Sequence, residues 1–230
     1  MSTIKGVLFD FNGTLFFDSP FHIMAFKKYF VEHGKEEPSE EFIIKNIFGR
    51  TNLTIYTENF NPNATPEEIE DFTNAKEGLY RQFCLENPDL MKYTDGAEEL
   101  LDYLKENNIP YCLATGSGMD NLSFYIEHMG LGRWFDESNM VYFDGSFPGK
   151  PEPDTYLLAA KKIGLDASDC VVFEDGTSGM MAARRADAAK VICVYEKTLP
   201  SPITDEAQPD ALYYDFTRWK EIVEDLKISR

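Results

Sequence analysis

Short apolar runs that end in polar or small residues recur along this chain of 230 residues. They occupy residues 4–9, 109–114, 140–143, 170–173 and 190–195, and most of the segments between them have the apolar spacing of helices. Strands that alternate with helices form a parallel sheet. We therefore expect an α/β fold, with a ligand site at the carboxyl ends of the strands, where open sheets of this kind form their crevices.

The segment between the first two runs interrupts this alternation. It contains only helical patterns, including those at residues 20–33, 39–47 and 66–86. One of these starts with Thr65, a capping residue, followed by Pro66 and two acidic residues, which favour the positive end of a helix. We expect a core domain formed by residues 1–15 and 89–230, with an inserted all-helical domain at residues 16–88.

Composition restricts the partners. Asp and Glu number 40 against 22 Lys and Arg, a formal net charge of -18 that disfavours binding to nucleic acid and to anionic membranes.

The four cysteines are widely spaced and are expected to be reduced core residues. No apolar run approaches the roughly 18 residues of a membrane span, and no signal sequence is evident. We expect a cytoplasmic protein, a monomer or a weak homodimer, with 43% hydrophobic residues to form its core.

Two candidate site segments end predicted strands. Asp10 closes the first run and precedes Asn12 and a glycine, although an Asp in this position often only makes a turn. The second run ends in Thr115-Gly116-Ser117, whose backbone amides could bind phosphate or could simply begin a helix.

Two further segments could supply charge. Lys150 lies between glycine and proline, a turn that could aim its ammonium at a carboxylate and at phosphoryl oxygens, although most lysines are solvated. Glu174 and Asp175 follow another apolar run and could bind Mg²⁺, which prefers oxygen ligands, or could belong to a capped turn. Three of the four segments end separate strands, so they are expected to converge.

In this order, the four segments resemble the four motifs of the haloacid dehalogenase superfamily, from Lys5 to Ala188. The helical insertion, His22 and the sequence G-K-P-x-P-D resemble the β-phosphoglucomutase-like branch. The resemblance implies a Rossmann-like core with a helical cap and a nucleophilic Asp10. It also implies phosphate binding by Thr115, Gly116 and Lys150. The implied magnesium ligands are Asp10, Glu174, Asp175 and the backbone carbonyl of Asn12.

Asn12 departs from the family pattern, which usually has an aspartate that exchanges protons with the leaving group and the incoming nucleophile. An amide cannot do this at neutral pH, and such assistance is typically worth about 10²- to 10⁴-fold in rate. Acyl phosphates and other activated esters should be affected least. Asn12 is also followed by glycine, a pair that favours deamidation to aspartate.

The helical insertion departs from the family as well. Arg50 follows Phe48-Gly49, where β-phosphoglucomutase has a lysine before the glycine. Arg50 could contact phosphate in its place or could be a solvated arginine. His22 could order the hinge near the site or could serve packing.

The resemblance implies a magnesium-dependent phosphohydrolase that acts on a small phosphorylated metabolite through an aspartyl-phosphate, slowed or specialised by Asn12. A phosphosugar mutase is the second interpretation. The third is a catalytically weak protein that binds or senses a phosphate ligand.

Overall fold

The computed structural model describes residues 4–228. The chain forms two compact units, which we call the core unit and the helical unit. The core unit comprises the residues up to Phe17 and from Lys92 onward, and the helical unit is Asp18–Met91. All the described strands belong to the core unit.

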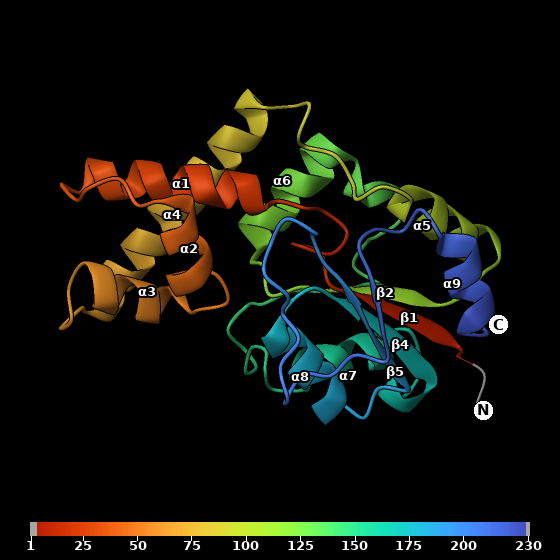
Figure 1. Cartoon of the computed structure of the whole chain (residues 1–230). Coiled ribbons are helices and arrows are strands. Elements are labelled where there is room, and N and C mark those ends of the chain that lie inside the picture. The colour runs from red at the N-terminus through yellow and green to blue at the C-terminus, as the bar shows by residue number, and fades with distance from the viewer. Residues whose placement is uncertain (1–3, 229–230) are drawn as a thin grey trace. The chain divides into compact units, whose positions relative to one another are not determined.

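The core unit is built on six parallel strands in the order β3-β2-β1-β4-β5-β6 (Figure 1). The strands are β1 (Gly6–Phe9), β2 (Tyr111–Ala114), β3 (Met140–Val141), β4 (Cys170–Glu174), β5 (Lys190–Val194) and β6 (Ala211–Tyr213). In β1, Phe9 pairs with Leu113 of β2 and with Phe173 of β4. Because these strands are parallel and in step, the residues that follow β1, β2 and β4 meet at one edge of the sheet.

Helices cover both faces of the sheet. The helices of this unit are α5 (Ala97–Glu106), α6 (Met119–Met129), α7 (Asp154–Lys162), α8 (Thr177–Arg185) and α9 (Trp219–Asp225), with short 3-10 turns η1 (Leu131–Arg133) and η2 (Ala167–Asp169). Figure 1 shows α7 and α8 on one side of the strands, and α5 and α9 on the other. Leu8 and Val172 belong to the cluster buried under α7 and α8. The alternate residues Phe9 and Phe173 stack at 5.2 Å on the opposite face, where Phe173 also meets Phe216.

The helical unit contains α1 (Ser19–Glu32), α2 (Glu40–Asn46), α3 (Asn52–Asn59) and α4 (Pro66–Glu86). Its buried cluster is largely aromatic and consists of Phe26, Tyr29, Phe30, Ile43, Ile47, Ile55 and Phe72. The predicted cap of α4 is present: Thr65 Oγ1 accepts the Glu68 N–H at 3.2 Å, and Glu68 Oε2 accepts the Thr65 N–H at 2.7 Å. These reciprocal bonds fix where the longest helix of the unit begins.

The predicted α/β class with a parallel sheet is confirmed, with two local differences. β3 ends at Val141 rather than at residue 143, because the Phe143 N–H donates to the Ser117 carbonyl at 3.1 Å outside the ladder. β6 was not predicted, since its three partly buried residues form no extended apolar run.

The four cysteines are free and buried, at Cys84, Cys112, Cys170 and Cys193. Burial raises the pKa of each thiol to about 12, so little reactive thiolate forms at neutral pH. None of the helices formed by the described residues combines the length and the apolar character needed to cross a membrane.

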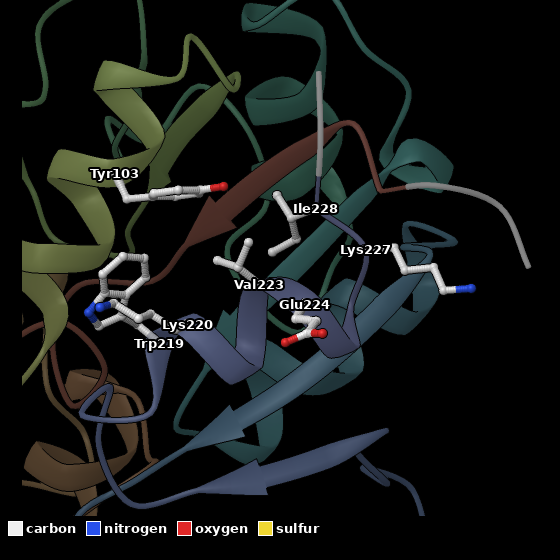
Figure 2. Close-up of a pocket in the computed structure, with 7 residues that line it drawn as sticks. All are labelled: Tyr103, Trp219, Lys220, Val223, Glu224, Lys227 and Ile228. Atoms are coloured by element: carbon white, nitrogen blue, oxygen red, sulfur yellow. The ribbon is translucent and has the colours of Figure 1, made fainter.

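A cavity of about 570 Å³ lies beside α5 and α9 in the core unit (Figure 2). It is lined by Tyr103, Trp219, Lys220, Val223, Glu224, Lys227 and Ile228. Ile228 forms a parallel bridge with Ile4, which precedes β1, whereas Asp10 follows β1. Ile228 and the predicted site therefore lie near opposite ends of that strand.

Gly96 directly precedes α5 and packs against the segment before α9. Its φ is +83°, and a Cβ at this position would lie 2.2 Å from the carbonyl oxygen of Phe216. Gly164 has a similar φ of +75° but nothing within 4 Å of its Cβ position. The two glycines share the left-handed conformation and differ in steric contact.

We expect Gly96→Ala to destabilise the protein more than Gly164→Ala. Both variants incur the left-handed penalty of about 1–2 kcal/mol, and only Gly96→Ala adds a clash with backbone, worth about 1–3 kcal/mol more. Urea unfolding of both variants measures the difference. Equal losses of unfolding free energy would show that the contact with Phe216 does not constrain this position.

Candidate active site

Three adjacent strands bring the predicted polar residues together. Asp10 directly follows β1, Thr115 follows β2 and Glu174 ends β4. The backbone continues the ladder through these positions, since the Asp10 N–H donates to the Phe173 carbonyl at 2.9 Å and the Thr115 N–H to that of Val141 at 3.0 Å. All three side chains are buried. The carboxyl edge of the sheet thus carries two carboxylates and a hydroxyl.

Lys150 reaches this edge from the turn before α7. Its Nζ lies 2.6 Å from Asp10 Oδ1 and 2.6 Å from Glu174 Oε1, and about 10% of its side chain is exposed. Burial disfavours the ammonium form, but the two carboxylates outweigh it and raise the pKa of Lys150 above its ordinary value. The lysine therefore stays charged and links Asp10, which follows β1, to Glu174, which ends β4.

Glu174 accepts four hydrogen bonds. Lys150 and the Tyr156 hydroxyl (2.8 Å) donate to Oε1, while the backbone N–H groups of Asp175 and Gly176 donate to Oε2 at 2.9 and 3.0 Å. Burial raises the pKa of a carboxyl group, but here Lys150 and these donors outweigh it and hold the pKa of Glu174 below its ordinary value. Glu174 is therefore a fixed anion at neutral pH.

Two glycines let the carboxylates approach the backbone. A Cβ at Gly13, whose φ is +78°, would lie 2.0 Å from Asp175 Oδ2. A Cβ at Gly179 in α8 would lie 1.7 Å from Glu174 Oε1. Neither carboxylate could keep its place beside a larger residue.

The donor set fits a hard divalent cation. Asp10, Glu174 and Asp175 each offer a carboxylate oxygen, and these oxygens lie within 4.8 Å of one another. Mg²⁺ binds through one or two carboxylates, with water and phosphate oxygens as further ligands. Glu174 would give up one of its four hydrogen bonds to bind a cation directly, so Asp10 and Asp175 are better suited to direct contact.

Asn12 is held by two hydroxyl groups. Its Nδ2 donates to the Tyr125 hydroxyl at 2.8 Å, and its Oδ1 accepts from the Ser117 hydroxyl at 2.7 Å. The Ser117 N–H in turn donates to Thr115 Oγ1 at 3.0 Å. Tyr125 is fully buried beside Phe11, with 4.5 Å between ring centroids. The amide thereby connects the segment after β1 to the segment after β2.

Arg50 and His22 belong to the helical unit and have local partners there. Arg50 Nη1 lies 2.5 Å from Glu58 Oε2 on the surface. His22 Nε2 lies 3.1 Å from Asp18 Oδ2, which also accepts the Tyr80 hydroxyl at 2.8 Å. A contact of either residue with the substrate phosphate stays a prediction.

The sequence did not predict Tyr156 and Gly179 as residues of the site, nor Tyr125 as a hydrogen-bond partner of Asn12. Tyr156 lies in α7, with its ring centroid 4.8 Å from Lys150 Nζ as well as its hydroxyl on Glu174. An aromatic residue at helical spacing ordinarily indicates packing, and a glycine inside a helix has no chemistry of its own. No local pattern in the sequence predicts that Tyr156 contacts Lys150.

Comparisons with known proteins identify the family. A family model of haloacid dehalogenase-like hydrolases matches residues 4–187. A solved haloacid dehalogenase (HAD) hydrolase, family IA, variant 3, from Entamoeba histolytica is 34% identical, with a TM-score of 0.85 over 99% of this chain and 100% of that chain. This chain belongs to the haloacid dehalogenase-like hydrolases.

Two relatives carry phosphatase names. The phosphorylated carbohydrates phosphatase of Thermotoga maritima is 29% identical over 82% of this chain and 84% of that protein. The bifunctional riboflavin kinase/FMN phosphatase of Arabidopsis thaliana is 32% identical over 82% of this chain but 48% of that protein, so this chain spans about half of its length. The predicted family and the predicted enzyme class, a HAD-type phosphatase, are confirmed.

We expect Tyr156→Phe to lower stability by about 1.5–3 kcal/mol, the usual contribution of a hydrogen bond to a charged group. The change removes the donor to Glu174 and keeps the ring beside Lys150. Chemical unfolding measures the loss, with Tyr214→Phe as the control because Tyr214 is 44% exposed. A loss no larger than that of the control would show that the hydroxyl contributes nothing to the buried anion.

We expect Asn12 to deamidate more slowly in the folded protein than in a peptide. The reaction requires the Gly13 nitrogen to attack Asn12 Cγ, but the Gly13 N–H donates to the Phe16 carbonyl at 2.7 Å and the amide is held at both ends. Two hydrogen bonds of about 1 kcal/mol each correspond to roughly 30-fold. Timed peptide mapping of native and digested protein measures the ratio. Equal rates would contradict the restraint.

Proposed function

We propose that this protein is a magnesium-dependent phosphatase that acts on a small phosphorylated metabolite through a phosphorylated Asp10. The observation that carries the proposal is the position of Lys150, 2.6 Å from Asp10 at the carboxyl edge of the sheet. A carboxylate can attack an anionic phosphate only where positive charge offsets their repulsion. The name of the Thermotoga relative, a phosphatase of phosphorylated carbohydrates, supports the substrate class.

The reaction would proceed in two displacements. An Asp10 oxygen attacks phosphorus, and the bond from phosphorus to the leaving group breaks, with its electron pair remaining on the leaving group. Water then attacks the same phosphorus and releases Asp10 and inorganic phosphate. The Thr115 hydroxyl and the backbone N–H of Gly116 would hold phosphoryl oxygens. Nothing lies within 4 Å of a Cβ placed on Gly116, which leaves room for a phosphate at its backbone.

Asp10, Asp175, Glu174 and the backbone carbonyl of Asn12 would hold the magnesium ion. When bound, the ion supplies positive charge that offsets the phosphoryl oxygens and the attacking carboxylate. Lys150 supplies a second positive charge from the protein itself.

The helical unit, Asp18–Met91, would act as a cap, as expected for the inserted domain predicted at residues 16–88. His22 and Arg50 are its candidate contacts to the phosphorylated substrate. The proposal also includes a cytoplasmic location, a monomer or weak homodimer, and no nucleic-acid partner, since the net charge of -18 opposes binding of polyanions.

A second function, binding or sensing of a phosphate ligand without turnover, is favoured by one observation. Asn12 is an amide held by Ser117 and Tyr125, so this position offers no acid or base. A phosphosugar mutase would use the same first step and pass the phosphoryl group to a sugar hydroxyl instead of water.

We expect Asp10→Ala to lower the rate of magnesium-dependent phosphate release by at least about 10³-fold, because the change removes the attacking oxygen. The measurement is phosphate release from phosphosugars and acyl phosphates, with and without EDTA, and peptide mapping for a phosphoryl group on Asp10. Glu152→Ala, an exposed change close to Lys150 in sequence, is the control.

Full activity in a folded Asp10→Ala protein would exclude Asp10 as the nucleophile. Saturable phosphate binding without release by the wild type would favour the sensor, and a rearranged phosphosugar would favour the mutase.

A further inference from the structure

The carboxyl edge of the sheet carries an attacking group and positive charge, but its described side chains include no suitable acid for a departing oxygen. Asp10 is the proposed nucleophile, and Glu174 and Asp175 belong to the proposed metal site. His128 is the one histidine of the core unit. It lies in the last turn of α6, about 14 Å along the helix from Met119, which is two residues after Ser117.

Lys150 and Tyr156 direct their donor groups at carboxylates. Lys150 Nζ lies 2.6 Å from both Asp10 Oδ1 and Glu174 Oε1. The Tyr156 hydroxyl donates to Glu174 Oε1 at 2.8 Å. In this arrangement neither donor is directed at a departing oxygen.

The side chain two residues after Asp10 does not supply the proton either. Asn12 is an amide, which neither gains nor loses a proton near neutral pH. Its contacts with Ser117 and Tyr125, at 2.7 and 2.8 Å, hold the amide in place. Those neighbours are hydroxyl groups, whose protons are weakly acidic.

We infer, on the basis of the proposed phosphatase function, that this site is selective for acyl phosphates, whose leaving group departs as a stabilised carboxylate and needs no proton. The conjugate acid of such a leaving group has a pKa of about 4, against about 16 for water, which represents an ordinary alcohol. General acid catalysis typically contributes about 10²- to 10⁴-fold. Alcohol leaving groups lose this contribution here, and carboxylates do not need it.

The second step, in which water attacks the phosphorylated Asp10, depends on the same side chains. The Asp10 oxygen attacks phosphorus, and the acyl oxygen leaves with the bonding electrons as a carboxylate. Water must then attack phosphorus and release its proton to solvent, because the side chains described at this edge of the core unit provide no ready base. The phosphorylated Asp10 should therefore accumulate during turnover of an acyl phosphate.

The test compares acetyl phosphate with glycerol 3-phosphate in the wild type and in Asn12→Asp. We expect Asn12→Asp to raise kcat/KM for glycerol 3-phosphate by about 10²- to 10⁴-fold and that for acetyl phosphate by less than about tenfold. Asp10→Ala gives the spontaneous background. Asn63→Asp, an exposed change in the helical unit, is the matched control for one added negative charge.

Rapid quenching followed by peptide mass analysis gives a second readout. The wild type should carry a phosphoryl group on most Asp10 residues during acetyl phosphate turnover, and Asn12→Asp on fewer. Equal gains for both substrates in Asn12→Asp, or no preference in the wild type, would overturn the selectivity while leaving the phosphatase intact. No turnover of any substrate and no phosphoryl group on Asp10 would overturn both.

Discussion

The ammonium of Lys150 is the interaction on which the rest of the site depends. Two carboxylates at the ends of neighbouring strands are buried side by side, and several kcal/mol per ion would oppose that burial without a counter-ion. Lys150 meets both at 2.6 Å, and α7 supports the pair because Tyr156 contacts the lysine with its ring and Glu174 with its hydroxyl. The turn before α7 thus provides both the charge and its support.

Backbone space is the second constraint. Asp175 lies where a side chain at Gly13 would be, and Glu174 where one at Gly179 would be. The backbone at Gly13, after β1, and at Gly179, in α8, therefore approaches the two carboxylates more closely than a residue with a Cβ could. Electrostatic attraction holds the charged groups together, and missing side chains make the approach possible.

Much of the sheet could be predicted because a strand buried on both faces is apolar throughout. This pattern located β1, β2, β4 and β5. The residues directly after the first and fourth apolar runs, Asp10 and Glu174, indicated the candidate site. β6 escaped prediction because a short, partly buried edge strand has no such pattern. The Asn12 contacts with Tyr125 and Ser117 escaped as well, since a hydrogen bond between residues 113 apart in the chain depends on packing that no local motif records.

The discontinuity of the core unit has a consequence for how the chain matures during synthesis. β1 emerges from the ribosome before its neighbours β2 and β4, which begin at Tyr111 and Cys170. The helical unit, which follows β1 and precedes β2, is one continuous segment. Loop closure over such separations is slow compared with local helix formation. The helical unit can pack its aromatic cluster while β1 still waits for both partners. In a growing chain, the apolar strand that precedes Asp10 is thus made before both of its neighbours and stays unpaired until they follow.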